Sequence, residues 1–253
     1  MENERLLSCL SEDFTRLRQI AAPVLSAGHA PRVPSCPEWT LDDLVQHVGM
    51  VYLHKVANMR TGAPAEWPPP DLASLPALSL LDRGYAELTA EFAARKPDER
   101  TFTWFEPDQT VGFWIRRMAQ ETVIHRVDAE LAVGTSPAEI PDDLAQDGVD
   151  EVLTRFLGYG SVAWHEEFAG VLPAQEEAPV LIRAGDRGWL VHIGPAGVQI
   201  SSAPPGSDAA AVVSGAPGPV LLWLWRRAES GVERAGDPRL VERLWAALEL
   251  ATQ

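Results

Sequence analysis

Three polar residues within the stretch MAQETVIHRVDAELAVG, residues 118–134, have types and spacing that suit metal binding. At about 100° per residue, a helix places Glu121, His125 and Asp128 in one narrow sector beside an apolar stripe. Glu121 and His125 are four residues apart, so their side chains project from adjacent turns and can reach one ion. Asp128 suits either an acceptor for the second N–H of a ligating histidine or a surface acid of the last turn. The pattern favours a metal site, with a hydrogen-bonded or solvated pair as the alternative.

A second predicted helix supplies further candidate ligands. Thr40 and Asp43 have the spacing of a capping box, which predicts a helix over residues 40–58. His47 and His54 share one heptad face of this helix. A lone histidine on such a face is usually a core residue. Two inward-facing histidines and one carboxylate from two helices of a bundle instead form a three-ligand set, which leaves a fourth position on zinc for water or substrate.

The elements that carry these residues divide the chain into two predicted domains. Residues 1–140 contain four amphipathic helices joined by irregular loops, one of them the proline-rich stretch 26–39, and this predicts a four-helix bundle. Residues 141–253 begin with a helix, continue with short β-like runs between turn residues and end in two helices. That pattern predicts a smaller α+β domain with a meandering sheet. The expected fold class is therefore mixed, an α domain followed by an α+β domain.

Composition excludes several classes of function. The chain has 36 acidic against 21 basic residues and a formal net charge of −15, which disfavours nucleic acid and anionic lipid as partners. It has no long apolar run that could span a membrane and no basic, apolar leader at its start, so we expect a cytoplasmic protein. Cys9 and Cys36 lack the spacing of a metal site or a disulfide framework, and we interpret them as small buried hydrophobes.

Two motifs make the chain resemble a known family. VPSCPEWTLDDLVQHVG, followed downstream by ETVIHRVDAELAVG, resembles the maleylpyruvate isomerase family, which belongs to the DinB-like group of metal-binding four-helix bundles. The stretches DGVDEVLTRFL, AAAVVSGAPGPVLLWLWRR and GDPRLVERL resemble the C-terminal domain of that family, an α+β unit likened to sterol-carrier folds. The resemblance therefore covers nearly the whole chain.

The resemblance implies a divalent metal, usually zinc, held by His47, Glu121 and His125. It also implies the small thiol mycothiol as cosubstrate. Zinc at an open site lowers the pKa of a bound thiol and so provides thiolate at neutral pH. In the family's reaction the thiolate adds to the C=C bond of an electron-poor acid, the former double bond rotates as a single bond, and elimination of the thiol leaves the trans isomer. No nucleophilic cysteine of the protein is needed for this chemistry.

Four further residues complete the expected site. By the resemblance, Arg227 clamps a substrate carboxylate, although a basic last turn that caps its own helix is the alternative. His54 is expected to line the pocket, and Trp114, from the same helical sector as the ligands, is expected to contact the substrate with it. Asp128 is expected to assist catalysis by steadying His125.

The sequence leaves the reaction open. Isomerisation of an unsaturated acid and transfer of mycothiol to an electrophile share their first step. A non-enzymatic module with structural zinc is another possibility, and so is a metal-dependent hydrolase with Asp128 or His54 as general base. The expected partners are mycothiol and a small-molecule electrophile or unsaturated acid, with no nucleic acid and no membrane, and the expected assembly is a monomer or homodimer.

Overall fold

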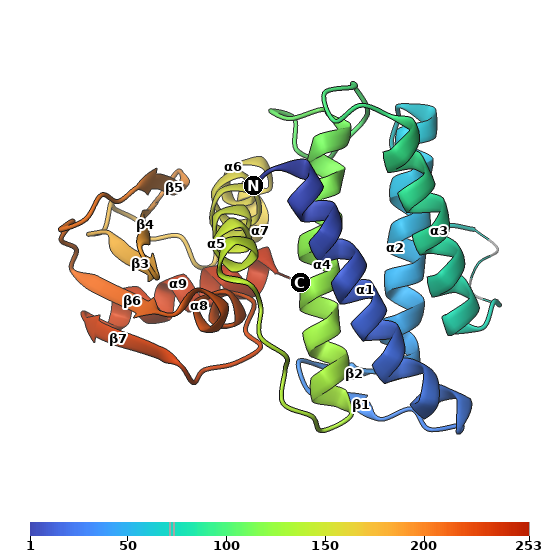
Figure 1. The fold of residues 1–253 in the computed structure, drawn as a ribbon. Coiled ribbons are helices and arrows are strands. Elements are labelled where there is room, and N and C mark those ends of the chain that lie inside the picture. The colour runs from blue at the N-terminus through green and yellow to red at the C-terminus, as the bar shows by residue number, and fades with distance from the viewer. Residues whose placement is uncertain (71, 73, 253) are drawn as a thin grey trace. The chain divides into compact units, whose positions relative to one another are not determined.

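The computed structural model describes residues 1–70, 72 and 74–252. The chain divides into two compact units, Met1–Ala138 and Glu139–Gln253. The first unit is built mainly of long helices, and the second combines helices with a five-stranded sheet (Figure 1). The predicted fold class, a helical domain followed by an α+β domain, is confirmed. No helix in the described part of the chain is both long and apolar enough to cross a membrane.

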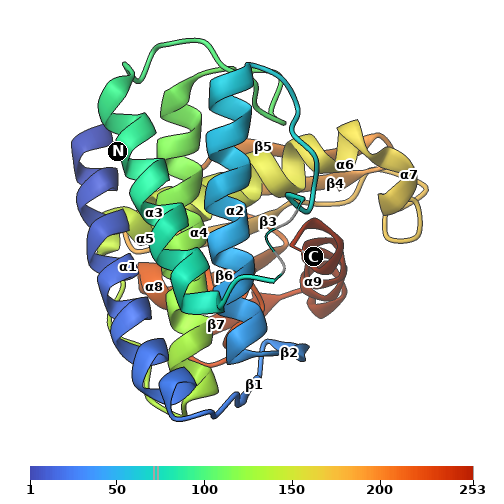
Figure 2. The ribbon, with the colours of Figure 1, turned by 90° about the vertical axis from the view of Figure 1, so that its right-hand side faces the viewer.

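Four long helices form the frame of the first unit. Helix α1 packs along α4 and α2 packs along α3, while α2 also contacts α4. Figure 2 shows the four helices running side by side. Their bounds are Asn3–Ser26 for α1, Leu41–Thr61 for α2, Ala77–Ala94 for α3 and Val111–Ala132 for α4.

The start of α2 is determined locally by its capping residues. The Oγ1 of Thr40 accepts a hydrogen bond from the backbone N–H of Asp43 at 3.3 Å, and the backbone N–H of Thr40 donates to Asp43 Oδ2 at 2.8 Å. This is the predicted capping box, and it is confirmed. At the other end, Gly62 adopts a φ of 64° and closes the helix. These contacts determine the register of the helix that carries His47.

Two glycines allow α2 and α3 to approach closely. A Cβ added at Gly49 would lie 2.8 Å from the backbone carbon of Leu80, and one added at Gly84 would lie 2.7 Å from the carbonyl oxygen of Gly49. No larger residue fits at either position without moving a helix. This close approach of α2 and α3 therefore determines the position of α2 in the unit.

The segment before α2 differs from the prediction. Residues 26–39 were expected to form a loop, but they contain two short antiparallel strands, β1 (Arg32–Val33) and β2 (Cys36–Thr40). The guanidinium of Arg32 donates to the carbonyl oxygen of Glu38 at 2.9 Å and ties the two strands together. Proline is tolerated here because strands this short and exposed leave few ladder positions for it to disrupt. The hairpin brings Ser35 and Trp39 to the bundle.

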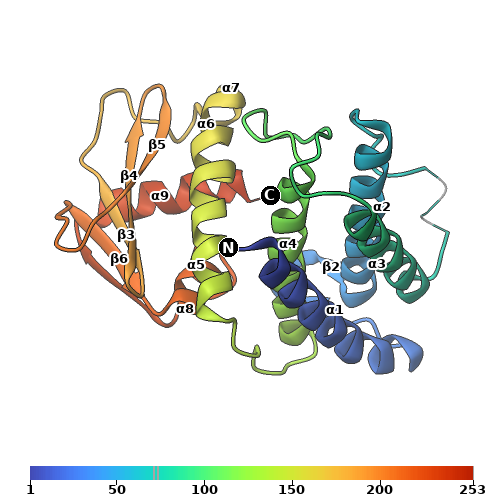
Figure 3. The same cartoon turned by 45° about the horizontal axis from the view of Figure 1, so that its top comes forward.

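The second unit places its helices against one face of the sheet (Figure 3). Its helices are α5 (Asp142–Glu151), η1 (Val152–Tyr159), α6 (Gly160–Ala163), α7 (His165–Phe168), α8 (Pro217–Leu224) and α9 (Pro238–Ala251). Its strands are β3 (Val180–Ala184), β4 (Arg187–Gly194), β5 (Gly197–Ser202), β6 (Ala211–Gly215) and β7 (Val232–Gly236). The segment η1, predicted as a continuous α-helix with α5, is a π-helix.

The sheet is not the meander that the sequence predicted. Its strand order is β5-β4-β3-β6-β7, and β6 runs parallel to β3 while the other pairs are antiparallel. Strands β3, β4 and β5 form an antiparallel unit with free edges at β5 and β3, and β6 pairs with the edge of β3 rather than with that of the preceding strand β5. Strand β7 was not predicted because its sequence VERAG is polar and exposed and lacks apolar alternation.

Helix α8 is shorter than predicted. It ends at Leu224, and the two arginines that were expected in its last turn lie beyond it. Arg226 adopts a φ of 59°, and the backbone N–H of Arg227 donates to the carbonyl oxygen of Leu222 at 2.8 Å. This turn ends the helix in the way that an αL residue commonly does. The arginines therefore lie beyond the last helical turn, not in it as predicted, but the guanidinium of Arg227 still caps the helix by donating to the carbonyl oxygen of the C-cap residue Trp225.

Candidate metal centre

Three potential ligand atoms from two helices converge in the first unit. The Oε1 atom of Glu121 lies 3.4 Å from Nε2 of His47 and 3.2 Å from Nε2 of His125. All three ligand atoms lie within 4.8 Å of one another. Their side chains are 15%, 22% and 10% exposed in the order named, so the cluster is partly in contact with solvent.

This donor set fits a divalent metal. Zinc binds histidine nitrogen and carboxylate oxygen at about 2.0–2.2 Å, so ligand atoms around a tetrahedral ion are about 3.3 Å apart. The two distances from Glu121 Oε1 match that separation. Among the described residues, no fourth histidine, cysteine or acidic residue joins the cluster. Three protein ligands are the usual number at a zinc site that keeps a position for water or substrate.

Arg117 orients the carboxylate of Glu121. Its guanidinium, which is almost fully buried, donates to Glu121 Oε2 at 2.9 Å from one turn earlier on α4. That bond occupies one carboxylate oxygen and leaves the other, Oε1, directed at the two histidines. The Glu121 side chain is thereby held as a ligand through a single oxygen.

Asp128 and Ser35 orient the ring of His125. Nδ1 of His125 lies 3.0 Å from Asp128 Oδ2, and the hydroxyl of Ser35 donates to Asp128 Oδ1 at 2.5 Å. The carboxylate is fully buried, so the interpretation of Asp128 as a surface acid is wrong. Because a carboxylate accepts the proton on Nδ1, Nε2 is the ring nitrogen that is directed toward Glu121. Asp128 thus has the contacts of a residue that positions a metal-ligating histidine.

Charge coupling within the cluster is strong in the metal-free protein. Burial lowers the pKa of His125, but the charge of Glu121 and the hydrogen bond to Asp128 outweigh it and raise that pKa to about 9. Burial raises the pKa of Glu121, yet the charge of His125 and the hydrogen bonds from both histidines hold it well below its usual value. Without a metal, the cluster is therefore held together as an ion pair.

Two tryptophans border the cluster. The ring centroid of Trp39, from β2, lies 4.7 Å from that of His47 and 6.4 Å from that of His125. Trp67, from the segment after α2, lies 5.8 Å from His47 and 5.2 Å from His54. Because Trp67 is 47% exposed, part of its indole is in contact with solvent beside His47.

Comparison with known families identifies the family of the chain. Residues 10–130 match the sequence model of the mycothiol maleylpyruvate isomerase N-terminal domain, and residues 143–243 match the model of the MDMPI C-terminal domain. The chain belongs to the mycothiol maleylpyruvate isomerase family. The resemblance that the two sequence motifs indicated is confirmed. No curated protein matches the chain by sequence.

Solved structures agree with this family assignment at the level of the fold. The chain is similar to the crystal structure of a mycothiol-dependent maleylpyruvate isomerase, with a TM-score of 0.62 and 15% identity over 94% of this chain and 95% of that one. A histidine-to-alanine mutant of a mycothiol-dependent maleylpyruvate isomerase gives the same values. The two domains of this family member therefore have the isomerase fold.

Two residues predicted to contact substrate have mainly internal partners in this family member. Nε2 of His54 lies 3.1 Å from the carbonyl oxygen of Ala65, and its Nδ1 lies 2.9 Å from Nζ of Lys55. Trp114 is fully buried and donates its indole N–H to the carbonyl oxygen of Phe102 at 2.9 Å. Only the part-exposed ring of His54 is open to a ligand. Trp114 contacts Lys55 through its ring face, whose centroid lies 5.2 Å from Nζ, but is not exposed to a ligand.

Arg227 of this family member belongs to the second unit. Its guanidinium donates to the carbonyl oxygen of Trp225 at 2.7 Å and lies 5.8 Å from the centroid of the Trp225 ring. Its role as a carboxylate clamp stays a prediction.

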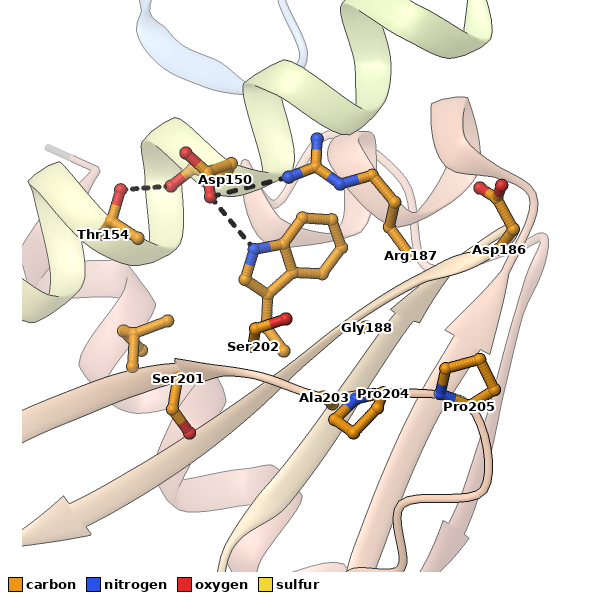
Figure 4. Close-up of a pocket in the computed structure, with 12 residues that line it drawn as sticks. Asp150, Thr154, Asp186, Arg187, Gly188, Ser201, Ser202, Ala203, Pro204 and Pro205 are labelled. Carbon is orange, nitrogen blue, oxygen red and sulfur yellow. Dashed lines mark hydrogen bonds and ion pairs between the residues drawn. The ribbon is translucent and has the colours of Figure 1, made fainter.

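The family member also has a cavity of about 340 Å³ within its second unit (Figure 4). Asp150 accepts a hydrogen bond from the indole N–H of Trp189 at 3.1 Å and has Arg187 at 3.9 Å, so these polar groups satisfy one another. The lining comes from α5, η1, the turn between β3 and β4, and the ends of β4 and β5. It contains none of the residues of the candidate metal centre.

Sequence reasoning did not find several residues of this site. Arg117 stands four residues before Glu121, a spacing that could have revealed the ion pair. Lys55 interrupts the apolar stretch MVYLHKVANM, which was also a detectable signal. Ser35 and Trp67 lie outside the long helices, where periodicity gives no information about which way a side chain faces.

Proposed function

We propose that this protein is a zinc-dependent enzyme that uses mycothiol to isomerise a small unsaturated acid. The observation that supports this most directly is the convergence of three donors, from the partly exposed side chains of His47, Glu121 and His125. Family membership supports mycothiol as the thiol. Zinc is the proposed metal because two imidazoles and one carboxylate are a common donor set at catalytic zinc sites.

The proposed ligands are His47 Nε2, Glu121 Oε1 and His125 Nε2. A zinc ion held there would supply Lewis acidity that keeps a bound thiol as thiolate at neutral pH. Arg117 directs Glu121 through Oε2. Asp128 holds the proton on Nδ1 of His125 and so keeps Nε2 available as a ligand.

The tryptophans shape the space for thiol and substrate. Trp39 covers the rings of both ligating histidines, which limits the approach of water from that side. Trp67 offers a flat apolar surface on which the unsaturated part of an acid can lie. The proposed clamp for a substrate carboxylate in the second unit is Arg227, and it rests on the family resemblance alone.

The first test is the metal content of tag-free protein by plasma mass spectrometry. We expect about one zinc per chain in the wild type and none in a His47→Ala/His125→Ala double variant. A His29→Ala variant is the matched control, because His29 is exposed and outside the cluster. Absence of stoichiometric metal after reconstitution with zinc would overturn the proposal.

The reaction is tested on the zinc-loaded protein with mycothiol and maleylpyruvate. We expect conversion to fumarylpyruvate that requires mycothiol but does not consume it. Consumption of one thiol per molecule of electrophile would instead identify a mycothiol S-transferase. Turnover without any thiol would reject both.

A further inference from the structure

The side chain of Lys55 lies at the edge of the candidate metal centre. Its Nζ atom is 2.9 Å from Nδ1 of His54, 5.9 Å from the ring centroid of Trp67 and 5.2 Å from that of Trp114. Trp67 also contacts the ring of His47, so one indole borders both the ammonium group and a proposed metal ligand. The residue is only partly exposed.

Lys55 has no acidic partner within ion-pair distance among the described residues. His54 Nε2 faces the carbonyl oxygen of Ala65 and donates to it, so His54 Nδ1 carries the lone pair and accepts one of the three ammonium protons. The two indoles attract the ammonium through their ring faces but accept no conventional hydrogen bond. Among the residues that the structure describes, two N–H groups of Lys55 therefore have no hydrogen-bond acceptor and can bind a ligand.

An ammonium without an ion pair among the described residues is unusual in this protein. Acidic residues outnumber basic ones by 36 to 21, and exposed arginines of the same unit pair with them. Arg18 binds Asp82 at 2.6 Å, and Arg60 binds Glu91 at 2.5 Å. The charge of Glu121 acts on Lys55 without reaching ion-pair distance. A partly buried charge that lacks a direct ion pair destabilises a fold, so the place of Lys55 beside the candidate metal centre points to an anionic ligand.

We propose that Lys55 is the anchor for a carboxylate of the substrate and makes the site selective for anionic acids. The inference rests on the proposed function, since it places the substrate of that reaction. His47 and Lys55 are eight residues apart on α2, about 12 Å along the helix axis, and both side chains reach back to the same indole. A short acid can therefore touch Lys55 with its carboxylate while its unsaturated carbons lie on Trp67, facing His47.

The test compares a carboxylate with a neutral amide of the same shape. Maleate and maleamide are titrated calorimetrically into zinc-loaded and into chelator-treated protein, as wild type, Lys55→Met and Lys55→Arg. Lys96→Met is the matched control, because Lys96 is the other lysine of the chain and is exposed. Zinc content, mycothiol binding and circular dichroism are recorded for every variant.

Maleate is expected to bind about thirtyfold more weakly to Lys55→Met than to the wild type. Lys55→Arg should retain most of the affinity, since it keeps the charge, and Lys96→Met should retain all of it. Maleamide should bind weakly and equally to all four proteins. The difference for maleate should persist after chelation, because the anchor acts through its own charge.

Two results would overturn the anchor. One is the lack of Lys55-dependent maleate binding, seen either as equal affinity in wild type and Lys55→Met or as no binding to the wild type. The other is a parallel loss of maleamide affinity in Lys55→Met, which would show that packing and not charge is responsible. If the protein binds zinc and mycothiol but its affinity for maleate does not depend on Lys55, only this inference is rejected. If maleate binding depends on Lys55 but the protein takes up no zinc, only the proposed function is rejected.

Discussion

At the scale of single residues, the candidate centre depends on side chains that hold the ligands in place. Asp128 is buried and bridges His125 and Ser35, so it fixes both the orientation and the tautomer of the histidine. Removal of such a partner typically weakens metal binding about 10- to 100-fold. We therefore expect Asp128→Asn to lose zinc affinity in that range, measured by competition with a chromophoric chelator. Asp98→Asn, at an exposed position, is the control, and equal affinity in both variants would contradict the positioning role.

Lys55 gives a prediction about stability and pH in the metal-free protein. Burial lowers its pKa to about 8 from an ordinary 10.5, while the charge of Glu121 opposes the shift and that of Arg117 adds to it. Between these two values the unfolded chain binds more protons than the folded one, so the stability of the wild type rises with pH there. At pH 7 the cost of the buried ammonium is on the order of 1–3 kcal/mol.

Lys55→Met should consequently be more stable than the wild type at pH 7, and the difference should shrink as the pH rises from 8 toward 10.5. His54 also faces Lys55, but burial and the Lys55 charge lower its pKa below 6.5, so it stays neutral across this window. Urea unfolding at several pH values measures the difference between the two proteins, with Lys96→Met for comparison. A constant difference across the window would show that the charge of Lys55 is not its source.

At the scale of elements, close packing of α2 against α3 places His47. A Cβ on Gly49 would lie 2.8 Å from backbone atoms of Leu80 and Leu81 and 2.9 Å from the Leu80 Cγ. Gly49→Ala should therefore destabilise the protein by about 1–3 kcal/mol, despite the better helix propensity of alanine. Gly170→Ala is the control, since an added Cβ there meets nothing within 4 Å. Thermal unfolding measures the change in stability. An unchanged or raised unfolding midpoint for Gly49→Ala would show that the close packing of α2 against α3 does not require a glycine at this position.

At the scale of the whole molecule, the proposed metal chemistry is confined to one unit. All three candidate ligands, together with Arg117 and Asp128, lie within Met1–Ala138. Zinc binding to the full-length chain should therefore slow amide hydrogen exchange chiefly in α2 and α4, because binding suppresses their local opening. Exchange in strands β3 to β6 should change little. Equal protection of the sheet would show that the two units respond as one.

The sequence by itself determined the features that depend on short-range contacts and on helical periodicity. Thr40 and Asp43 specify where α2 begins, through contacts three residues apart. The spacing of Glu121 and His125 places both on one side of α4 in any α-helix. Such features need no knowledge of the rest of the chain. For the same reason, the motifs were sufficient to recognise the family.

Only the tertiary structure decided how distant segments meet. It directs His47 of α2 at Glu121 of α4 and brings Ser35 to Asp128 across 93 residues of chain. It also places Lys55 between two indoles, with no ion pair to any acid of the described residues. It also made β6 parallel to β3 where the sequence predicted a meander. These outcomes depend on which surfaces pack against each other and on the closure of long loops, and neither is encoded in the periodicity of a single segment.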